Sequence, residues 1–232
     1  MSATAGIAAG KVKITVIARH IEEGAGPYIG HLMAKEIARF ASGTTGDYPV
    51  ELPADFPYRL LLIKALITAN TPQAAITKAK ISCDADAFIP VNDWTEDLVD
   101  MNEQRFGYAE QDVVVFAGDD ESEFTDIYDI KRAFACPAAD ENLTTIEAIA
   151  AETVQFGCYT FSAPSTPALV TDDKSIPVYV AGNCPHACIC IPFGDMLDPD
   201  SWFDARVYGS VKLSLTQAVG AACSIVIQQL KV

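Results

Sequence analysis

The densest group of potentially reactive side chains lies in the run CPHACIC, which begins at Cys184. Its three thiols and one imidazole, from Cys184, His186, Cys188 and Cys190, are ligand types that bind zinc. Their spacing is not a usual paired zinc pattern, and no second histidine follows His186. If residues 187–193 form a strand, Cys188 and Cys190 share one face, where small thiols pack as hydrophobes. We therefore interpret these four candidate ligands as packing residues and expect no metal site.

The segment Asp84-Ala-Asp86 is a second candidate metal site. Together with Asn92 and Asp93 it would supply the oxygen ligands that calcium prefers. The segment lacks the glycine pivot and the glutamate at a fixed offset that calcium loops use. A polar turn at the end of a strand is the favoured interpretation.

Catalytic residue patterns are scarce in this chain. The three histidines, His20, His31 and His186, are far apart in sequence, and there is no Gly-x-Ser-x-Gly elbow or phosphate-binding glycine loop. Neither Trp94 nor Trp202 lies in a group of aromatic residues suited to stacking a sugar. The sequence therefore predicts a protein that is not an enzyme, with no catalytic residue, no cofactor and no small-molecule substrate.

Composition limits the partners. Acidic residues outnumber basic ones by 31 to 16, for a net charge of −15, which opposes binding to a nucleic-acid backbone. Half of the residues are hydrophobic, enough for a large core, so we expect the seven cysteines to be reduced and mostly buried. We see neither a secretory signal nor the roughly 20 apolar residues of a membrane span, and expect synthesis and assembly inside a cell.

Residues 57–91 are the segment around which we expect the fold to be organised. Two runs with strand character, Tyr58–Thr68 and Ala75–Asp84, are separated by a turn that contains Asn70 and Pro72. The first run is almost entirely apolar, and the second alternates between polar and small apolar residues. We expect the two runs to be neighbouring antiparallel strands of one sheet, packed against a second sheet.

Other segments predict further strands and three short helices. The strand candidates, by alternation or apolar content, are 11–19, 112–117, 124–133, 154–161, 176–181, 187–193, 208–216 and 222–230. Helical spacing predicts a helix within 28–40, a capping segment at 92–95 predicts one over 96–106 that stops at Gly107, and a capping box predicts one over 144–153. Residues 194–205 are expected to be a loop with one helical turn.

About ten strands with a few short helices predict an all-β fold. We expect a single jelly-roll barrel or sandwich of two antiparallel sheets, with short helices inserted in its loops. This domain would span residues 11–232. Residues 1–10, which are small and uncharged, would form a flexible N-terminal arm.

Three segments, 58–97, 156–162 and 191–232, together resemble a known family. They are similar to the single, upright jelly-roll major capsid proteins of tailless icosahedral viruses with an internal membrane. Within the adenovirus-type jelly-roll lineage, the sphaerolipovirus-like proteins are the nearest in size. The resemblance covers about two thirds of the chain. It rests on the order of strand, turn and capped-helix segments rather than on an invariant motif.

The resemblance implies a structural protein of the virion. Such a barrel would stand perpendicular to an icosahedral shell and associate into pseudo-hexameric capsomers, assembled in the host cytoplasm. Its partners would be copies of itself, a second capsid protein and an underlying viral membrane, with no direct contact to nucleic acid. The arm over 1–10 would become ordered on assembly.

Two other functions remain open at this point. One is a jelly-roll module that binds a carbohydrate or another ligand through loops at one end, which requires an aromatic platform or a calcium cage. The other is a cupin-like metalloenzyme, which requires several inward-facing histidines and a glutamate on its strands. Electron microscopy separates the capsid protein from both, because only a capsid protein would form a lattice.

Overall fold

The computed structural model describes residues 30–68, 70–117, 121–135, 142–162, 166–169 and 174–231. The predicted arm over 1–10, the predicted strand over 11–19 and His20 lie outside these residues, so the domain boundary at residue 11 stays a prediction. Within the described residues, no helix has the length and apolar character needed to cross a membrane.

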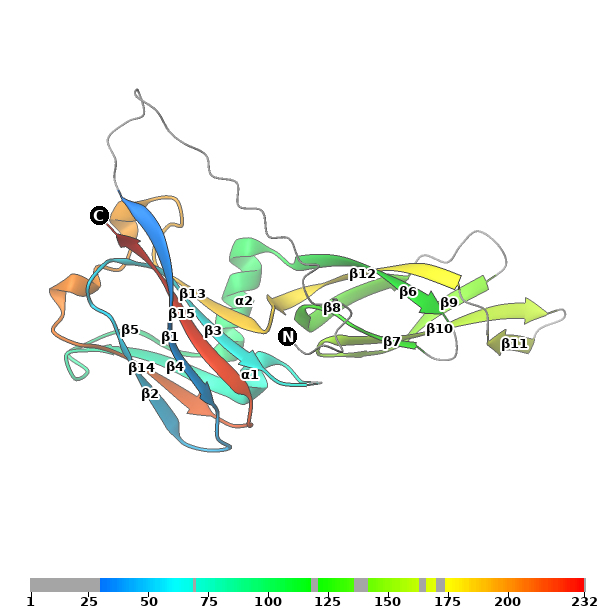
Figure 1. Ribbon diagram of the computed structural model, residues 1–232, viewed down its shortest axis with the longest axis horizontal. Coiled ribbons are helices and arrows are strands. Elements are labelled where there is room, and N and C mark those ends of the chain that lie inside the picture. The colour runs from blue at the N-terminus through cyan, green and yellow to red at the C-terminus, as the bar shows by residue number, and fades with distance from the viewer. Residues whose placement is uncertain are drawn as a thin grey trace, which may run out of the picture. The chain divides into compact units, whose positions relative to one another are not determined.

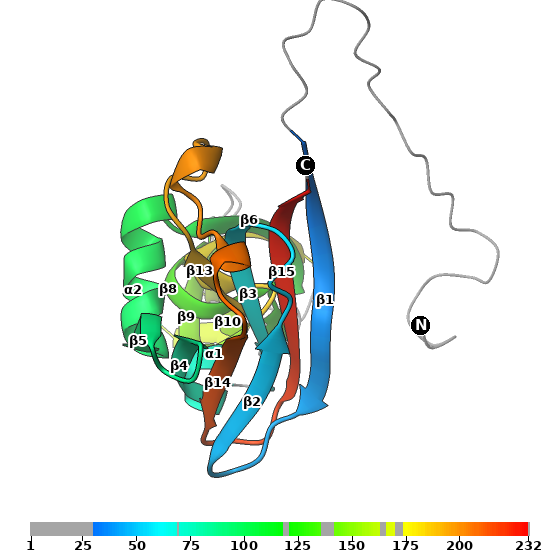
Figure 2. The ribbon, with the colours of Figure 1, turned by 90° about the vertical axis from the view of Figure 1, so that its left-hand side faces the viewer.

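Eight strands form two four-stranded antiparallel sheets that enclose the main core (Figures 1 and 2). In the first sheet the order is β1 (His31–Ala41), β15 (Ala222–Lys231), β3 (Tyr58–Leu66) and β13 (Cys188–Pro192). In the second sheet it is β2 (Asp47–Leu52), β14 (Val211–Gln217), β4 (Ile76–Cys83) and β5 (Phe88–Trp94). Counted along the chain, these eight strands run 1-8-3-6 and 2-7-4-5, which is a jelly roll. The predicted all-β jelly-roll fold is confirmed.

The core lies between the two sheets and is built by alternation. Leu61 and Ile63 of β3, Leu213 of β14, and Ile225 and Ile227 of β15 are all fully buried. Because successive side chains of a strand point to opposite faces, alternate residues along β3, β14 and β15 meet the facing sheet. Removal of this apolar surface from water is the main force that holds the two sheets together.

The predicted pairing of residues 58–68 with residues 75–84 is wrong. β3 pairs with β15 and β13, whereas β4 pairs with β14 and β5 in the facing sheet. The short helix α1 (Pro72–Ala75) connects them, and Pro72 occupies its first turn, where a missing N–H is tolerated. The connection carries the chain across the core, so the two strands face each other instead of pairing.

The helix predicted within residues 28–40 is also wrong, because residues 31–41 form the edge strand β1. β1 pairs with β15 from His31 to Ala41, and the register shifts between Glu36 and Ala38. A bulge inserts one residue and shifts the alternation by one position. Ile37 and Phe40 therefore both pack against the core, at a spacing that resembles one turn of a helix.

Of the other two predicted helices, one is confirmed. α2 spans Thr95–Phe106 and ends at Gly107, which has φ 73° and donates its N–H to Glu103 O at 2.8 Å. No side chain caps its N-terminus; instead the Thr95 hydroxyl donates to Ile76 O. The helix predicted over 144–153 is wrong, since β9 (Asn142–Ala150) is a strand paired with β10.

α2 covers one edge of the sandwich, beside β5, β4 and β13 (Figure 2). Leu98 and Val99 are buried in the main core, and Asn102 Nδ2 donates to Cys190 O on β13 at 2.9 Å. β13 is the outermost strand of its sheet, so the helix satisfies a backbone acceptor that would otherwise be open.

A long segment between α2 and β13 forms two further antiparallel sheets. One has the order β6-β12-β8, and in the other β10 pairs with β7, β9 and β11. Ile127, Val154, Val178 and Val180 form a small second core. The strands are β6 (Ala109–Ala117), β7 (Glu121–Phe124), β8 (Ile127–Ala135), β10 (Thr153–Ser162), β11 (Thr166–Leu169) and β12 (Lys174–Pro185). The sequence predicted strands over 112–117, 124–133, 154–161 and 176–181 of this segment, but a helix over 144–153, and it did not predict separate sheets.

At one end of the sandwich, the β2–β3, β4–β5 and β13–β14 connections meet. Asp84 in the β4–β5 turn donates its N–H to Ser210 O at 3.0 Å, and Tyr58 exchanges backbone bonds with Phe203 of 2.8 and 3.2 Å. The β13–β14 connection contains two 3-10 turns, η1 (Pro199–Ser201) and η2 (Ala205–Val207), where one helical turn was predicted.

Candidate functional site

The cysteines of the predicted zinc group lie around a cavity. Cys188 and Cys190 share one half-buried face of β13, while Ile189 and Ile191 on the opposite face are buried in the core, as the alternation predicts. Cys184, near the end of β12, is buried. These three thiols line a mainly apolar cavity of about 280 Å³ between β13, β3 and α2.

His186 does not complete a metal site with these thiols. Its side chain is 71% exposed, and Nδ1 lies 3.8 Å from Oδ1 of Asp126 in the inserted segment. Its backbone N–H donates to Asp126 O at 2.6 Å. Among the residues that the structure describes, no group of three or more His, Cys, Asp or Glu is placed to hold a metal ion. Cys184, Cys188 and Cys190 instead pack around the cavity.

Burial makes these thiols poor nucleophiles. It raises the pKa of Cys190 to about 11 and also raises the pKa of Cys184 and Cys188. Because the thiolate is the reactive form, we expect iodoacetamide at neutral pH to label Cys190 far more slowly in the folded than in the denatured protein. The folded-state rate should rise roughly tenfold per pH unit towards pH 11, as the thiolate fraction does. Mass spectrometry of the labelled peptides measures this rate. Rapid labelling of folded Cys190 at neutral pH would contradict the prediction.

The residues considered as calcium ligands are engaged with other protein groups. Asp86 accepts hydrogen bonds from Lys80 Nζ at 2.8 Å and from Ser82 Oγ at 2.5 Å. These two donors hold the pKa of Asp86 below its usual range. Asn92 and Asp93 lie on β5, paired with β4, rather than in the turn. The lysine supplies the positive charge that a cation would otherwise bring.

The end of the sandwich where the three connections meet contains an aromatic groove of about 510 Å³. Three of its rings, from Phe88, Phe203 and Tyr208, are nearly parallel and form what we call the ring stack. The Phe88 and Tyr208 centroids are 5.6 Å apart at 2°, those of Phe203 and Tyr208 are 5.6 Å apart at 12°, and those of Phe88 and Phe203 are 6.5 Å apart at 13°. Offset parallel packing is a favourable geometry for aromatic rings.

Buried residues hold the ring stack from behind. Phe203 lies 5.5 Å from both Tyr58 and Phe193, which are themselves buried in the core. The Tyr58 hydroxyl donates to Pro53 O at 2.8 Å, and burial raises the pKa of Tyr58, so this phenol stays a donor. Phe88, at the front of the stack, is 45% exposed. The core therefore fixes the buried side of the groove, while its outer side is open to solvent.

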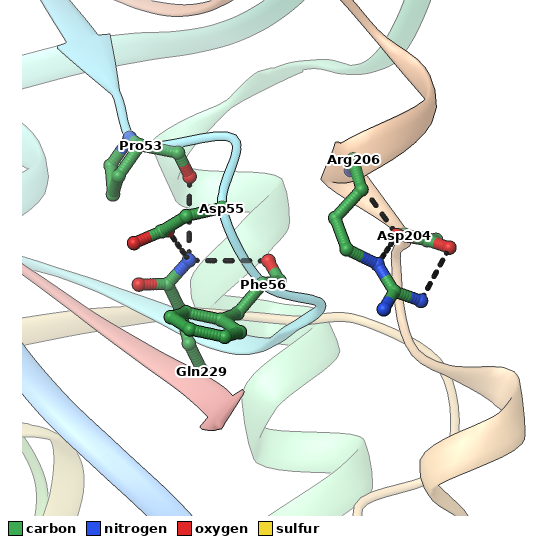
Figure 3. A network of polar contacts seen from close by, with 6 residues as sticks. All are labelled: Pro53, Asp55, Phe56, Asp204, Arg206 and Gln229. Atoms are coloured by element: carbon green, nitrogen blue, oxygen red, sulfur yellow. Dashed lines mark hydrogen bonds and ion pairs between the residues drawn. The ribbon is translucent and has the colours of Figure 1, made fainter. Parts of the chain in front are cut away.

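Polar groups surround the groove on the β13–β14 connection. Trp202 is mostly buried, and its Nε1 donates to Asp195 O at 2.6 Å. Asp204 and Arg206 form a two-bond pair, with Nε to Oδ1 at 2.8 Å and Nη2 to Oδ2 at 2.9 Å (Figure 3). Asp204 also accepts the Arg206 backbone N–H at 3.1 Å, which fixes the orientation of the carboxylate.

Sequence reasoning missed this groove. Trp94 is 57% exposed, and Lys78 Nζ lies 5.5 Å from its ring. Trp202, for which no aromatic group was predicted, lines the groove together with Phe88, Phe203 and Tyr208. Phe88 comes from a different sheet region far away in sequence, and only the fold brings it to the stack. The available signal was the local density of aromatic residues in the β13–β14 connection.

Comparisons with protein-family profiles, with curated proteins and with solved structures find no match to this chain.

Proposed function

We propose that this chain is a structural protein of a virus particle, a major capsid protein whose copies associate into the capsomers of an icosahedral shell. The observation that carries the proposal is the eight-strand jelly roll with a large β-rich insertion between its fifth and sixth strands. Jelly rolls of two Greek keys are an architecture of viral capsid proteins, among other classes. The sequence resemblance to single jelly-roll capsid proteins points the same way.

The surface supports a protein that contacts other proteins. Large apolar side chains are exposed on two adjacent elements: Ile89 and Trp94 on β5 are 40% and 57% exposed, and Met101 and Phe106 on α2 are 54% and 51% exposed. We call these four residues the β5–α2 surface. Exposed apolar side chains on adjacent elements are typical of protein interaction surfaces. We propose that it forms lateral contacts between copies, or with a second capsid protein.

The net charge supports a membrane between the shell and the genome. At −15, a shell of these chains would repel a bare genome, so an intervening membrane is the neighbour we propose on the inner side. The protein would then be located in the shell of the virion.

Association of the protein should increase with salt. Copies that each carry a charge of −15 repel one another, and this repulsion is screened as the Debye length falls from about 10 Å at 0.1 M salt to about 3 Å at 1 M. Apolar contacts do not weaken under the same conditions. We expect sedimentation velocity to show a shift from monomers to oligomers as salt rises, and electron microscopy to show capsomer-like rings or lattices.

A matched pair of variants tests the surface itself. Trp94→Asp should reduce association because it places a charge on the β5–α2 surface. Val114→Asp is the control, since Val114 is equally exposed, at 61%, but lies on β6 in the inserted segment. Equal effects of the two variants would refute the β5–α2 surface as a contact. A wild-type protein that stays monomeric at every salt and protein concentration would refute the capsid proposal.

A further inference from the structure

We propose that the aromatic groove is a binding site for a neutral oligosaccharide, with one pyranose ring lying on the exposed side of the ring stack. The proposal goes beyond the capsid function and does not depend on it. It also departs from the expectation, drawn from the sequence, that the chain binds no small molecule. The residues that carry it are Phe88, Phe203, Tyr208, Trp202 and Asp204.

The angles between the rings indicate a flat ligand. Cages for quaternary ammonium groups surround the cation with several aromatic faces, so their rings stand at steep angles to one another. In this groove the three rings are within 13° of parallel. A parallel stack offers a flat apolar platform, which suits a ring with one apolar face, such as a pyranose with axial C–H groups, or a nucleobase.

Charge separates these two kinds of flat ligand. The β13–β14 connection carries four carboxylates, on Asp195, Asp198, Asp200 and Asp204. Its own guanidinium, that of Arg206, is paired with Asp204, and the two that reach it from other elements, Arg59 and Arg105, donate to the carbonyl oxygens of Met196 and Gly194. A nucleotide brings phosphates that require clustered cations, and these carboxylates would repel them. A neutral sugar brings only hydroxyls, each a donor and an acceptor, for which carboxylates are good partners.

Asp204 lines the groove, and its carboxylate, oriented by Arg206, is suited to accept hydrogen bonds from sugar hydroxyls. Its geometry is fixed by three hydrogen bonds between the two residues, two from the guanidinium and one from the backbone N–H. The carboxylate oxygens keep lone pairs for further donors, and the guanidinium keeps N–H groups for an acceptor. Both residues are partly exposed, at 40% and 51%.

The size and rigidity of the groove fit this ligand. Its volume of about 510 Å³ lies within the range of roughly 300–1,000 Å³ that is common for small-molecule sites. Phe203 is held by Tyr58 and Phe193 from the core, so the platform exists before the ligand arrives. A site that is already ordered loses little conformational freedom on binding, which favours affinity.

Binding can be followed through Trp202, which lines the groove. The Trp94→Phe background removes the other tryptophan, so the fluorescence of the full-length protein reports Trp202 alone. The probes are hexasaccharides of glucose with β-1,4, α-1,4 and β-1,3 linkages, of mannose, of xylose and of N-acetylglucosamine. Hexagalacturonate is the charged comparison. We expect saturable changes with at least one neutral probe at or below millimolar concentration, and none with hexagalacturonate.

Two variants at exposed aromatic residues distinguish the groove from the rest of the surface. Phe88→Ala removes the exposed front ring and should weaken binding at least tenfold, while circular dichroism and the unfolding midpoint stay close to those of the parent. Phe124→Ala, at an exposed aromatic residue on β7 of the inserted segment, outside both the groove and the β5–α2 surface, should leave affinity unchanged. Asp204→Asn should weaken binding by a smaller factor, because it removes charge but keeps one acceptor.

Three results would overturn the proposal. The first is no response to any neutral probe at millimolar concentration. The second is binding that Phe88→Ala leaves intact, which would place the sugar elsewhere. The third is a wild-type protein that associates through this face, becomes monomeric as Phe88→Ala and binds no sugar, which would make the groove a contact between copies. Because Trp94→Asp tests association and Phe88→Ala tests sugar binding, failure of one proposal is distinguishable from failure of the other.

Discussion

Gln229→Glu should destabilise the folded protein by about 3–5 kcal/mol at neutral pH, the range observed when a buried charge is left without a partner. Gln229 on β15 is fully buried, and its Nε2 donates to Pro53 O at 3.3 Å, to Asp55 Oδ1 at 2.8 Å and to Phe56 O at 3.1 Å (Figure 3). In the variant an oxygen replaces this nitrogen and faces three acceptors. The other oxygen, Oε1, has no hydrogen-bond partner in the described part of the chain. Urea denaturation followed by fluorescence measures the loss.

The preceding residue provides the control for this variant. Gln228 lies on the opposite face of β15, where its Oε1 accepts a hydrogen bond from Arg59 Nη1 at 2.5 Å. Gln228→Glu places a carboxylate beside that guanidinium and should be neutral or slightly stabilising, because the pair becomes an ion pair. The same substitution at adjacent positions thus has opposite expected effects. Equal stability of the two variants would refute the buried-amide interpretation.

The destabilisation by Gln229→Glu should also depend on pH. Burial beside three acceptors raises the folded-state pKa of the new carboxyl above its unfolded value of about 4.3. A group whose folded-state pKa is raised is tolerated while it is protonated, so the penalty is small below about pH 4 and grows as pH rises through the unfolded pKa. The gap in unfolding free energy between the variant and the wild type should therefore be narrower at pH 4 than at pH 7.

Gly182→Ala is expected to have the second largest effect, a loss of roughly 3 kcal/mol, at the upper end of the range for overpacking. A Cβ at this position would lie 2.8 Å from Ile130 Cα and still closer to the Asp129 carbonyl oxygen, and both are backbone atoms of the paired strand β8. The register of β12 on β8 shifts between Ala181 and Gly182. The two backbones approach so closely at this bulge that only a glycine fits.

Hydrogen exchange locates the effect of Gly182→Ala. Protection of the amides in β8 and β12 should fall, while the amides of β3 and β15 in the sandwich stay protected, because proteins open in local units. Gly43→Ala is the control: its nearest neighbour would be Gln217 Oε1 at an ordinary 3.6 Å, so its effect should stay within about 0.5 kcal/mol. Uniform loss of protection along the whole chain would show that the inserted sheets and the sandwich unfold as one unit.

The capsid and sugar proposals place different demands on the same fold. In the capsid proposal, association would use the outer side of β5 and α2, where Trp94 and Phe106 are exposed. In the sugar proposal, binding would use the end of the sandwich, where Phe88 meets the β13–β14 connection. In a jelly roll the sheets are held by their core, so the connections at the ends are free to vary and to bind ligands.

Local patterns in the sequence determined the class of fold. Alternation in residues 76–83 and 222–231 identified the core strands, because the side-chain period of a strand is a property of the strand alone. The same alternation placed Cys188 and Cys190 on one face. The sequence also predicted α2 and its end at Gly107, since a glycine with positive φ is a local stop signal.

What only the tertiary structure decided was which segments meet. Whether β3 pairs with β4 or faces it depends on contacts with β15 and β14, more than a hundred residues later in the chain. The bulge in β1 gave this strand an apolar spacing that is typical of a helix, because a one-residue shift changes which side chains point inward. Phe88 lies beside Phe203 and Tyr208 only because the fold brings distant segments of the chain together. Pairing between distant segments leaves no local periodicity in the sequence, and for that reason the groove became visible only in the folded chain.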